Sequence, residues 1–189
     1  MNQLRVALGL AALLVWAARC QAGQAQVAVA ANFAEPIKAV AAVLQKTTGH
    51  TLSVSLGATG KLYAQIRNGA PFDVLLAANT ETPTALEKEG LALAGSRFTY
   101  ATGKLVLWSA DAQRVDAQGA VLKRGNFQHL AYANPKTAPY GAAAVEVMER
   151  LGLGKSLAPK LIQGESIGQT MTFVASGNAD IGFVALSQV

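Results

Sequence analysis

The stretch Ser55-Leu56-Gly57-Ala58-Thr59-Gly60-Lys61-Leu62 joins an alternating apolar run, residues 51–56, to a segment of helical character, residues 62–67. A small-residue turn between a strand and a helix leaves the first helical N–H groups without intrahelical partners, and they point into the turn. Together with the helix dipole and the hydroxyl of Thr59, these donors predict a seat for an anion. The alternative interpretation is that the turn only caps the helix.

The end of this stretch, Gly60-Lys61, resembles the end of a nucleotide-binding P-loop. That loop needs Ser or Thr directly after its lysine to hold magnesium, and a glycine at its first position. Leu62 and Ser55 occupy these two positions here, so the sequence argues against a nucleotide site. A dedicated metal site is not expected either, because His50 and His129 lie far apart and no cluster of metal-ligating residues occurs.

Strand-like runs alternate with helical segments along the rest of the chain, which predicts parallel strands in an α/β fold. The expected strands are residues 27–31, 51–56, 72–77, 105–108, 130–133 and 180–185. Ligands of such sheets bind beyond the carboxyl ends of the strands. Asn32 follows the first strand and Thr59 the second, so they lie close together if these strands are neighbours. Tyr140 and the turn at residues 164–169 repeat the pattern, which predicts two α/β lobes facing each other.

The first 25 residues have the form of a secretory signal peptide. A positive start precedes a short apolar run at residues 6–18, and residues 22–25 offer small side chains for cleavage. Lipidation of Cys20 is not expected, because Arg19 stands where a small residue is needed. The rest of the sequence has no cysteine and no long apolar run. We therefore predict an exported, periplasmic protein that is held together by its core.

Charge and residue types narrow the classes of function. The formal net charge of +5 falls to +3 without the first 25 residues, which hold two arginines and no acidic residue. The cationic residues are scattered without interleaved aromatics, which argues against a nucleic-acid partner and suits small anions. The sequence has no Gly-x-Ser-x-Gly elbow and no recognisable pair of carboxylates, so we predict a protein that is not an enzyme. A secreted hydrolase on a two-lobe fold is the alternative from another class.

In this order, several motifs make residues 27–189 resemble the periplasmic molybdate-binding proteins of ABC importers. The motifs are Val29-Ala30-Ala31-Asn32-Phe33, Gly57-Ala58-Thr59-Gly60-Lys61-Leu62, Gly69-Ala70-Pro71-Phe72-Asp73-Val74, Pro139-Tyr140-Gly141 and Asp180-Ile181-Gly182-Phe183-Val184. The resemblance implies a type II periplasmic-binding fold with mainly parallel sheets. It also implies a monomer without a cofactor that captures molybdate, and tungstate, and delivers it to a membrane permease. Another oxyanion or a small carboxylate is the alternative ligand.

The resemblance also implies which residues hold the oxyanion. They are neutral donors at the strand-to-helix turns: Asn32, Thr59, Tyr140 and Ile167, with the N–H groups of Ala31, Ala58 and Ser166 beside them. Molybdenum is reached only through the molybdate oxygens, so none of these residues is a direct metal ligand. Preorganised N–H dipoles in a dehydrated cleft stabilise a dianion without Arg or Lys. Some relatives use a tyrosine of the last strand where this chain has Ala185, and Tyr140 is expected to supply that hydroxyl.

The same resemblance divides the chain into parts. They are the signal peptide at residues 1–25, the first lobe at 26–100, a hinge crossover at 101–104 and the second lobe at 105–189. Relatives continue with further elements that return to the first lobe. We therefore expect the first lobe to lack its C-terminal part here, which leaves apolar surface exposed on that lobe. The lobes are expected to close about the hinge.

Overall fold

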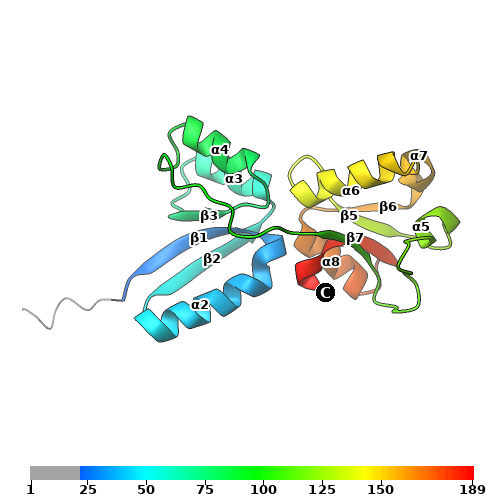
Figure 1. The fold of residues 1–189 in the computed structure, drawn as a ribbon, viewed down its shortest axis with the longest axis horizontal. Helices are drawn as coiled ribbons and strands as arrows, with labels where there is room; N and C mark the ends of the chain where they lie inside the picture. Colours follow the sequence, from blue (N-terminus) through cyan, green and yellow to red (C-terminus); the bar gives the residue numbers. More distant parts are fainter. Residues whose placement is uncertain (1–21) are drawn as a thin grey trace, which may run out of the picture.

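The computed structural model describes residues 22–189 and places them in two sheets that lie side by side, each covered by helices (Figure 1). The expected signal peptide, residues 1–25, lies almost entirely outside the described residues. Within residues 22–189, no helix combines the length and the apolar character that crossing a membrane requires.

The first sheet has three parallel strands in the order β2-β1-β3. Its lobe contains β1 (Gln24–Ala30), η1 (Ala31–Phe33), α2 (Ala34–Thr48), β2 (Thr51–Gly57), α3 (Thr59–Arg67), β3 (Val74–Leu76) and α4 (Glu81–Lys88). The central strand is β1, and its residues 27–30 are at most 3% exposed. Burial on both faces explains why this strand is a continuous apolar run. Helix α2 ends at Gly49, whose φ of 76° is a left-handed value that favours glycine.

The second sheet has four strands in the order β4-β7-β5-β6, with β4 antiparallel to β7 and the other pairs parallel. Its lobe contains β4 (Leu105–Trp108), α5 (Val121–Arg124), β5 (Leu130–Ala133), α6 (Pro139–Arg150), α7 (Gly154–Leu157), η2 (Ala158–Lys160), β6 (Leu161–Gly164), α8 (Ile167–Ala175), β7 (Ile181–Ala185) and η3 (Leu186–Gln188). Every residue of β7 is buried. The main core packs Leu130 and Ile181 of the central strands with Met148 of α6.

The expected α/β architecture with mainly parallel sheets is confirmed, with two departures in the strands. The sequence does not predict β6, because its run of four residues is short and contains a polar Gln163. The third strand is shorter than the expected residues 72–77. Asp73 precedes it, and the Asp73 carboxylate accepts the N–H of Gln26 at 2.7 Å. A side chain therefore takes the place of a strand carbonyl at this end of β3.

Strand β1 begins at Gln24, three residues before its expected start at Val27. Gln24 and Ala25 pair with Thr51 and Leu52 of β2, although Gln24 is exposed. Backbone pairing, which hydropathy does not report, extends the strand. The predicted boundary between residues 25 and 26 falls inside β1, so a chain cut there would lose the first two pairs of this ladder.

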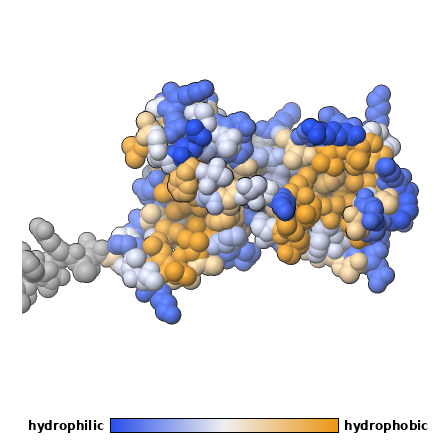
Figure 2. All heavy atoms as spheres, in the orientation of Figure 1, coloured by the Kyte–Doolittle hydropathy of each residue, from blue (hydrophilic) through white to orange (hydrophobic). Residues whose placement is uncertain are grey.

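Two segments connect the lobes. Residues 89–104 cross from α4 to β4, and η3 packs back against η1 and α2 after β7 (Figure 1). Exposed apolar side chains are most numerous on the first lobe and the crossing segment, where Leu93 is 82% and Phe98 is 78% exposed. Figure 2 shows apolar residues gathered over the β1–β2 side of the first lobe and over a face of the second lobe. The sequence predicts apolar surface on this lobe.

Candidate functional site

The two lobes present the same local geometry to each other. In the first lobe β1 and β2 are parallel neighbours, which meets the condition for Asn32 and Thr59 to lie close together. Ala30 pairs with Gly57, so the turns after both strands begin side by side. In the second lobe β5 and β6 are parallel neighbours, and Ala133 pairs with Gly164. Each of the four turns starts a helix or a helical turn. The first N–H groups of such helices have no intrahelical partner and lie at the carboxyl edges of the sheets. That of Gly60 donates to the carbonyl oxygen of Thr137, and Pro139 at the start of α6 has none.

The turns from both lobes meet in one buried cluster. Its members are Ala31, Ala58, Ala133, Ala138, Tyr140, Ile167 and Ala185. Most members are alanines, whose small side chains let the backbones of the turns approach one another. Asn32 and Thr59 directly follow two cluster members in the first lobe. The structure therefore brings together the residues that the sequence predicts for the ligand site, with Ser166 directly before Ile167.

Thr59, the first residue of α3, is 1% exposed. Its Oγ1 accepts a hydrogen bond from the N–H of Ala78 at 3.1 Å, just after β3. A hydroxyl has one donor and two acceptor sites. Because Ala78 uses an acceptor site, the single O–H donor of Thr59 remains for a ligand. The backbone N–H of Thr59 belongs to the first turn of α3 and is a second donor at the same place.

Asn32 carries a buried side-chain oxygen, Oδ1, that has no hydrogen-bond partner within residues 22–189. A buried polar atom without a partner costs free energy, so a ligand that satisfies the carboxamide is favoured. A half-turn about its last bond exchanges the oxygen and the NH₂ group, so the side chain is able to donate to an anion. The carbonyl of Asn32 accepts the hydroxyl of Ser187 at 2.6 Å, which anchors this residue to η3.

Tyr140 is the second residue of α6 and is 9% exposed. Its hydroxyl lies against Gly103, where any side chain would overlap with it. Burial raises the pKa of Tyr140 above its ordinary value of 10.0, and a hydrogen bond from Asn32 acts in the opposite direction. The phenol is therefore a neutral donor at physiological pH. Ala185, which stands where some relatives have tyrosine, belongs to the same buried cluster.

Ile167 begins α8 behind the N-cap residue Ser166, whose hydroxyl accepts the N–H of Gln169 at 3.3 Å. This bond satisfies the N–H of Gln169, one of the first N–H groups of the helix. The N–H groups of Ile167 and Gly168 come before it in the helix and have no intrahelical partner. A Cβ atom placed on Gly168 would lie 3.3 Å from the Cβ of Ala31. The start of α8 therefore faces the turn after β1.

Two further polar residues beside the site are not predicted from the sequence. Asn79 Oδ1 and Thr137 Oγ1 are buried without a hydrogen-bond partner within residues 22–189. Asn79 follows β3, so the rule that selects Asn32 and Thr59 applies to it as well. Thr137 lies in the loop before α6, and its position beside the first lobe depends on lobe packing, for which the sequence holds no local signal.

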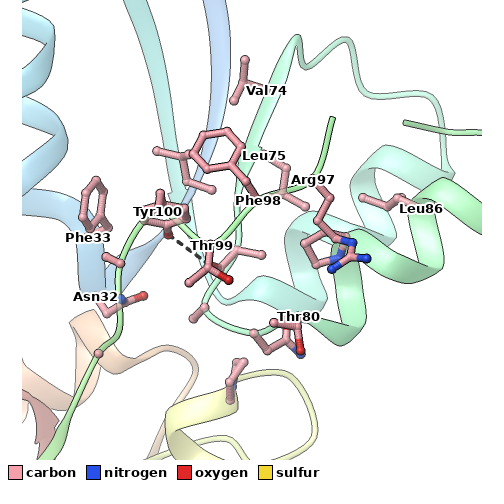
Figure 3. Close-up of a pocket in the computed structure, with 18 of the residues that line it drawn as sticks. Asn32, Phe33, Val74, Leu75, Thr80, Leu86, Arg97, Phe98, Thr99 and Tyr100 are labelled. Atoms are coloured by element: carbon pink, nitrogen blue, oxygen red, sulfur yellow. Dashed lines mark hydrogen bonds between the residues drawn. The ribbon is translucent and has the colours of Figure 1, made fainter. Parts of the chain in front are cut away.

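A large cavity of about 850 Å³ lies next to these turns. Figure 3 shows it with Asn32, Phe33 and Tyr100 at one end and Leu86 with Arg97 at the other. Tyr140 also lines it, but most of its wall is apolar and belongs to the first lobe and the crossing segment. This space is too large and too apolar to hold a tetrahedral oxyanion by itself. Of the predicted site residues, Asn32 and Tyr140 line this cavity.

The buried cluster contains no charged side chain. Within residues 22–189 no group of three or more His, Cys, Asp or Glu residues is placed to hold a metal ion. Lys61 and Glu165, beside two of the turns, form an ion pair with each other at 2.6 Å, and Lys136 lies in the turn after β5. The arrangement supplies hydroxyl, amide and backbone donors, and these suit a small anion.

The family described as bacterial extracellular solute-binding protein matches residues 25–189. The chain belongs to this family. It is 60% identical over 189 residues to the molybdate-binding protein ModA of Azotobacter vinelandii, which covers 100% of this chain and 74% of that protein. It is 52% identical to ModA of Rhodobacter capsulatus, over 97% of this chain and 72% of that protein. The resemblance predicted from the motifs is thereby confirmed.

Solved structures agree with this assignment. The periplasmic molybdate-binding protein of Azotobacter vinelandii matches with a TM-score of 0.86 at 46% identity, over 87% of this chain and 72% of that one. The sulfate-binding protein SubI from Mycobacterium tuberculosis H37Rv matches with a TM-score of 0.67 at 13% identity, over 86% of this chain and 64% of that one. The second match shows the fold alone, and the expected two-lobed periplasmic-binding fold is confirmed by the first.

Proposed function

We propose that this protein captures molybdate between its two lobes, outside the cytoplasmic membrane, and delivers it to the permease of an ABC importer. The observation that carries the proposal is the convergence of four helical N-termini, two from each lobe, on one buried cluster. Membership of the solute-binding family and 60% identity to a molybdate-binding protein support it. The family is one of binding proteins, so the protein is not assigned an enzymatic activity.

The ligand would be held by neutral donors. Asn32 and Thr59 contribute side chains from the first lobe, and Tyr140 contributes a protonated phenol from the second. The N–H groups of Ala31, Ala58 and Ile167 complete the set around the cluster. Apart from the half-turn of the Asn32 carboxamide, the donors are held by the fold, so little reorganisation is needed when the dianion loses its water. The metal atom of the ligand is enclosed by its own oxygens and touches no residue.

Tungstate is expected to bind as well, because it is a tetrahedral dianion like molybdate. Sulfate is a smaller tetrahedral dianion, so the size of the closed seat would select against it. The lobes would open and close about residues 101–104, where Gly103 lies against Tyr140 and couples this crossing to the site. An exported form that keeps β1 whole would begin at or before Gln24. Another oxyanion or a small carboxylate is the competing ligand.

A titration with four oxyanions tests the proposal. Molybdate, tungstate, sulfate and phosphate are added at equal ionic strength, and heat of binding and melting temperature are measured. A ligand at 100 times its dissociation constant adds about 2.7 kcal/mol to the stability of the folded state, which raises the melting temperature clearly. A response to molybdate and tungstate but not to sulfate is expected. A response to sulfate or phosphate alone would mean that this anion, and not molybdate, is the ligand. No response to any of the four would contradict the proposed function.

A further inference from the structure

The turns that carry the site residues also contact one another across the two lobes. Lys61 Nζ, on α3, lies 2.6 Å from Glu165 Oε2, in the turn before α8. One residue earlier, the N–H of Gly60 donates to the carbonyl oxygen of Thr137 at 2.8 Å. Both contacts join the first lobe to the second. Separation of the lobes would break both of them.

These contacts stand next to the site residues in the sequence. Gly60 and Lys61 follow Thr59 directly, and Glu165 precedes Ile167 by two residues. The movement that forms the contacts is therefore the same movement that brings the donors of both lobes to the anion. Any free energy that the contacts add to the closed state also slows the escape of the anion, because the lobes must separate before it leaves.

We propose that Gly60, Lys61, Thr137 and Glu165 form a clasp that holds the lobes closed and sets the rate at which the bound oxyanion is released. The proposal rests on the function proposed above, because retention of an oxyanion is the task given to the clasp. It also assigns a role to Gly60-Lys61, the dipeptide that resembles the end of a P-loop. In this role Lys61 is a positioning residue and does not touch the ligand.

The surroundings of Lys61 favour the clasp over a direct role in attracting the anion. Its ammonium group is paired with Glu165, so the two charges cancel close to the seat. The turn that carries Glu165 is held in place, because the N–H of Glu165 donates to the side-chain oxygen of Gln169 at 2.7 Å. Both members of the pair are about half exposed, so the attraction is modest and weakens with salt.

Gly60 contributes to the clasp because it has no side chain, which lets the backbone of Thr137 approach closely. A Cβ atom at this position would lie 3.0 Å from the carbonyl oxygen of Thr137 and 3.1 Å from its Cα. Both are backbone atoms, which cannot move aside as a flexible side chain does. Alanine is favoured over glycine inside a helix, so helix formation gives no reason for a glycine in α3. The close approach of the second lobe gives that reason.

Charge reversal tests the clasp in the whole protein. Lys61→Glu and Glu165→Lys each replace an attraction across the lobes by a repulsion, and the double variant restores the attraction with the signs exchanged. We expect each single variant to release molybdate about 3- to 10-fold faster than the wild type, measured by stopped-flow exchange. The double variant should return to within about twofold of the wild type. At 1 M salt the single variants should approach the wild type, because the charges are screened.

The signs of the two single variants separate the clasp from a direct electrostatic effect on the anion. Lys61→Glu makes the protein more negative and Glu165→Lys makes it more positive, so a direct effect would weaken binding in one and strengthen it in the other. The clasp predicts faster release in both. Arg150→Glu is the matched control: it breaks an exposed pair with Glu146 within α6 and changes the net charge as Lys61→Glu does. Its release rate should equal that of the wild type.

The outcomes distinguish this inference from the proposed function. If the wild type binds none of the four oxyanions, the proposed function fails and the clasp fails with it. If the wild type binds molybdate and both single variants release it at the wild-type rate, the clasp alone is overturned. Opposite effects of the two variants, or no recovery in the double variant, would also overturn it. All of these positions are exposed, and melting temperatures recorded without ligand verify that each variant is folded.

Discussion

Thr59 Oγ1 accepts the N–H of Ala78 at 3.1 Å, although the two residues follow different strands of the first sheet. This bond orients the Thr59 hydroxyl before any ligand arrives. Ala78 follows β3 and Thr59 follows β2, and these strands flank β1 on its two sides. The bond therefore links the outer strands across the end of the central strand, where the anion is expected.

Thr59→Val is expected to weaken molybdate binding while it keeps the shape of the side chain. Loss of one hydrogen bond to a charged ligand costs about 1.5–3 kcal/mol, or roughly 10- to 150-fold in dissociation constant. Thr59→Ser retains the hydroxyl and should bind within a few-fold of the wild type. Isothermal titration calorimetry of the wild type and the two variants measures their dissociation constants for molybdate. Equal affinities for the valine variant and the wild type would remove Thr59 from the site.

Asn32→Asp is expected to abolish measurable binding of a dianion, although the two side chains have nearly the same shape. The substitution places a carboxylate where the buried carboxamide now lies. Two like charges at a buried position repel each other strongly, and the carboxylate cannot donate a hydrogen bond when ionised. Asn32→Ala removes only a donor and should lose about 1.5–3 kcal/mol of binding free energy. An aspartate variant that binds as well as the alanine variant would place the side chain outside the seat.

Tyr140 should give molybdate affinity a simple dependence on pH. Burial holds its pKa above the ordinary value of 10.0, so the phenol stays protonated and able to donate throughout the neutral range. Affinity should be constant between about pH 7 and 9 and should fall only as the pH rises through the raised pKa. Tyr140→Phe should bind more weakly and lack this alkaline fall. Titrations of both proteins with molybdate at several pH values test this prediction. It is contradicted if the wild type loses affinity between about pH 7 and 9 and Tyr140→Phe does not.

Gly60→Ala should change thermal stability and affinity in opposite directions. Alanine is favoured over glycine within a helix by up to about 1 kcal/mol, so the ligand-free protein should melt at the same temperature or higher. The added methyl group would press on Thr137 only when the lobes are closed, and molybdate affinity should fall. Melting curves with and without molybdate measure both effects. If the variant binds molybdate as tightly as the wild type, the contact between residue 60 and Thr137 accommodates a side chain, and the prediction is wrong.

Asp180 should stabilise the second lobe at neutral pH and lose this effect in acid. Its Oδ2 accepts the N–H of Gln128 at 2.8 Å and that of His129 at 2.9 Å. The hydrogen bond from His129, followed by that from Gln128 and the charge of Arg114, lowers the pKa of Asp180 below 3.8. A lowered pKa in the folded state means that the stabilisation is complete above the unfolded value and disappears as the pH falls through the folded value.

Asp180→Ala should therefore cost about 2 kcal/mol of unfolding free energy at pH 7, from two N–H groups that lose their acceptor. The difference from the wild type should shrink as the pH falls through the lowered pKa of the wild-type carboxyl, because that carboxyl is then being protonated. Asp111→Ala is the control, since Asp111 also lies 3.6 Å from Arg114 but accepts only a local N–H within its own turn. Urea unfolding at several pH values measures these differences. Equal losses in the two variants would contradict the role of Asp180.

The order of strands and helices could be predicted from local patterns. A continuous apolar run marks β1 as a strand buried on both faces, and small or polar residues mark the turns that start α3 and α8. Strand ends were harder to predict, because Gln24 and Asp73 join the ladder through backbone or side-chain bonds that hydropathy does not report. The short β6 is held by its pairing with β5 rather than by its own composition.

The sequence by itself determined which residues stand at strand-to-helix turns, because the residue types that start helices and leave N–H groups free act within a few positions. That is why the turns at Asn32, Thr59, Tyr140 and residues 164–169 could be named from the pattern, while the resemblance to a known family pointed to Ile167. Only the tertiary structure decided that these turns share one seat, and that Thr137 and Glu165 meet Gly60 and Lys61 across it. Contacts between residues some 80 to 100 positions apart depend on how two sheets pack, and packing is a property of the whole chain.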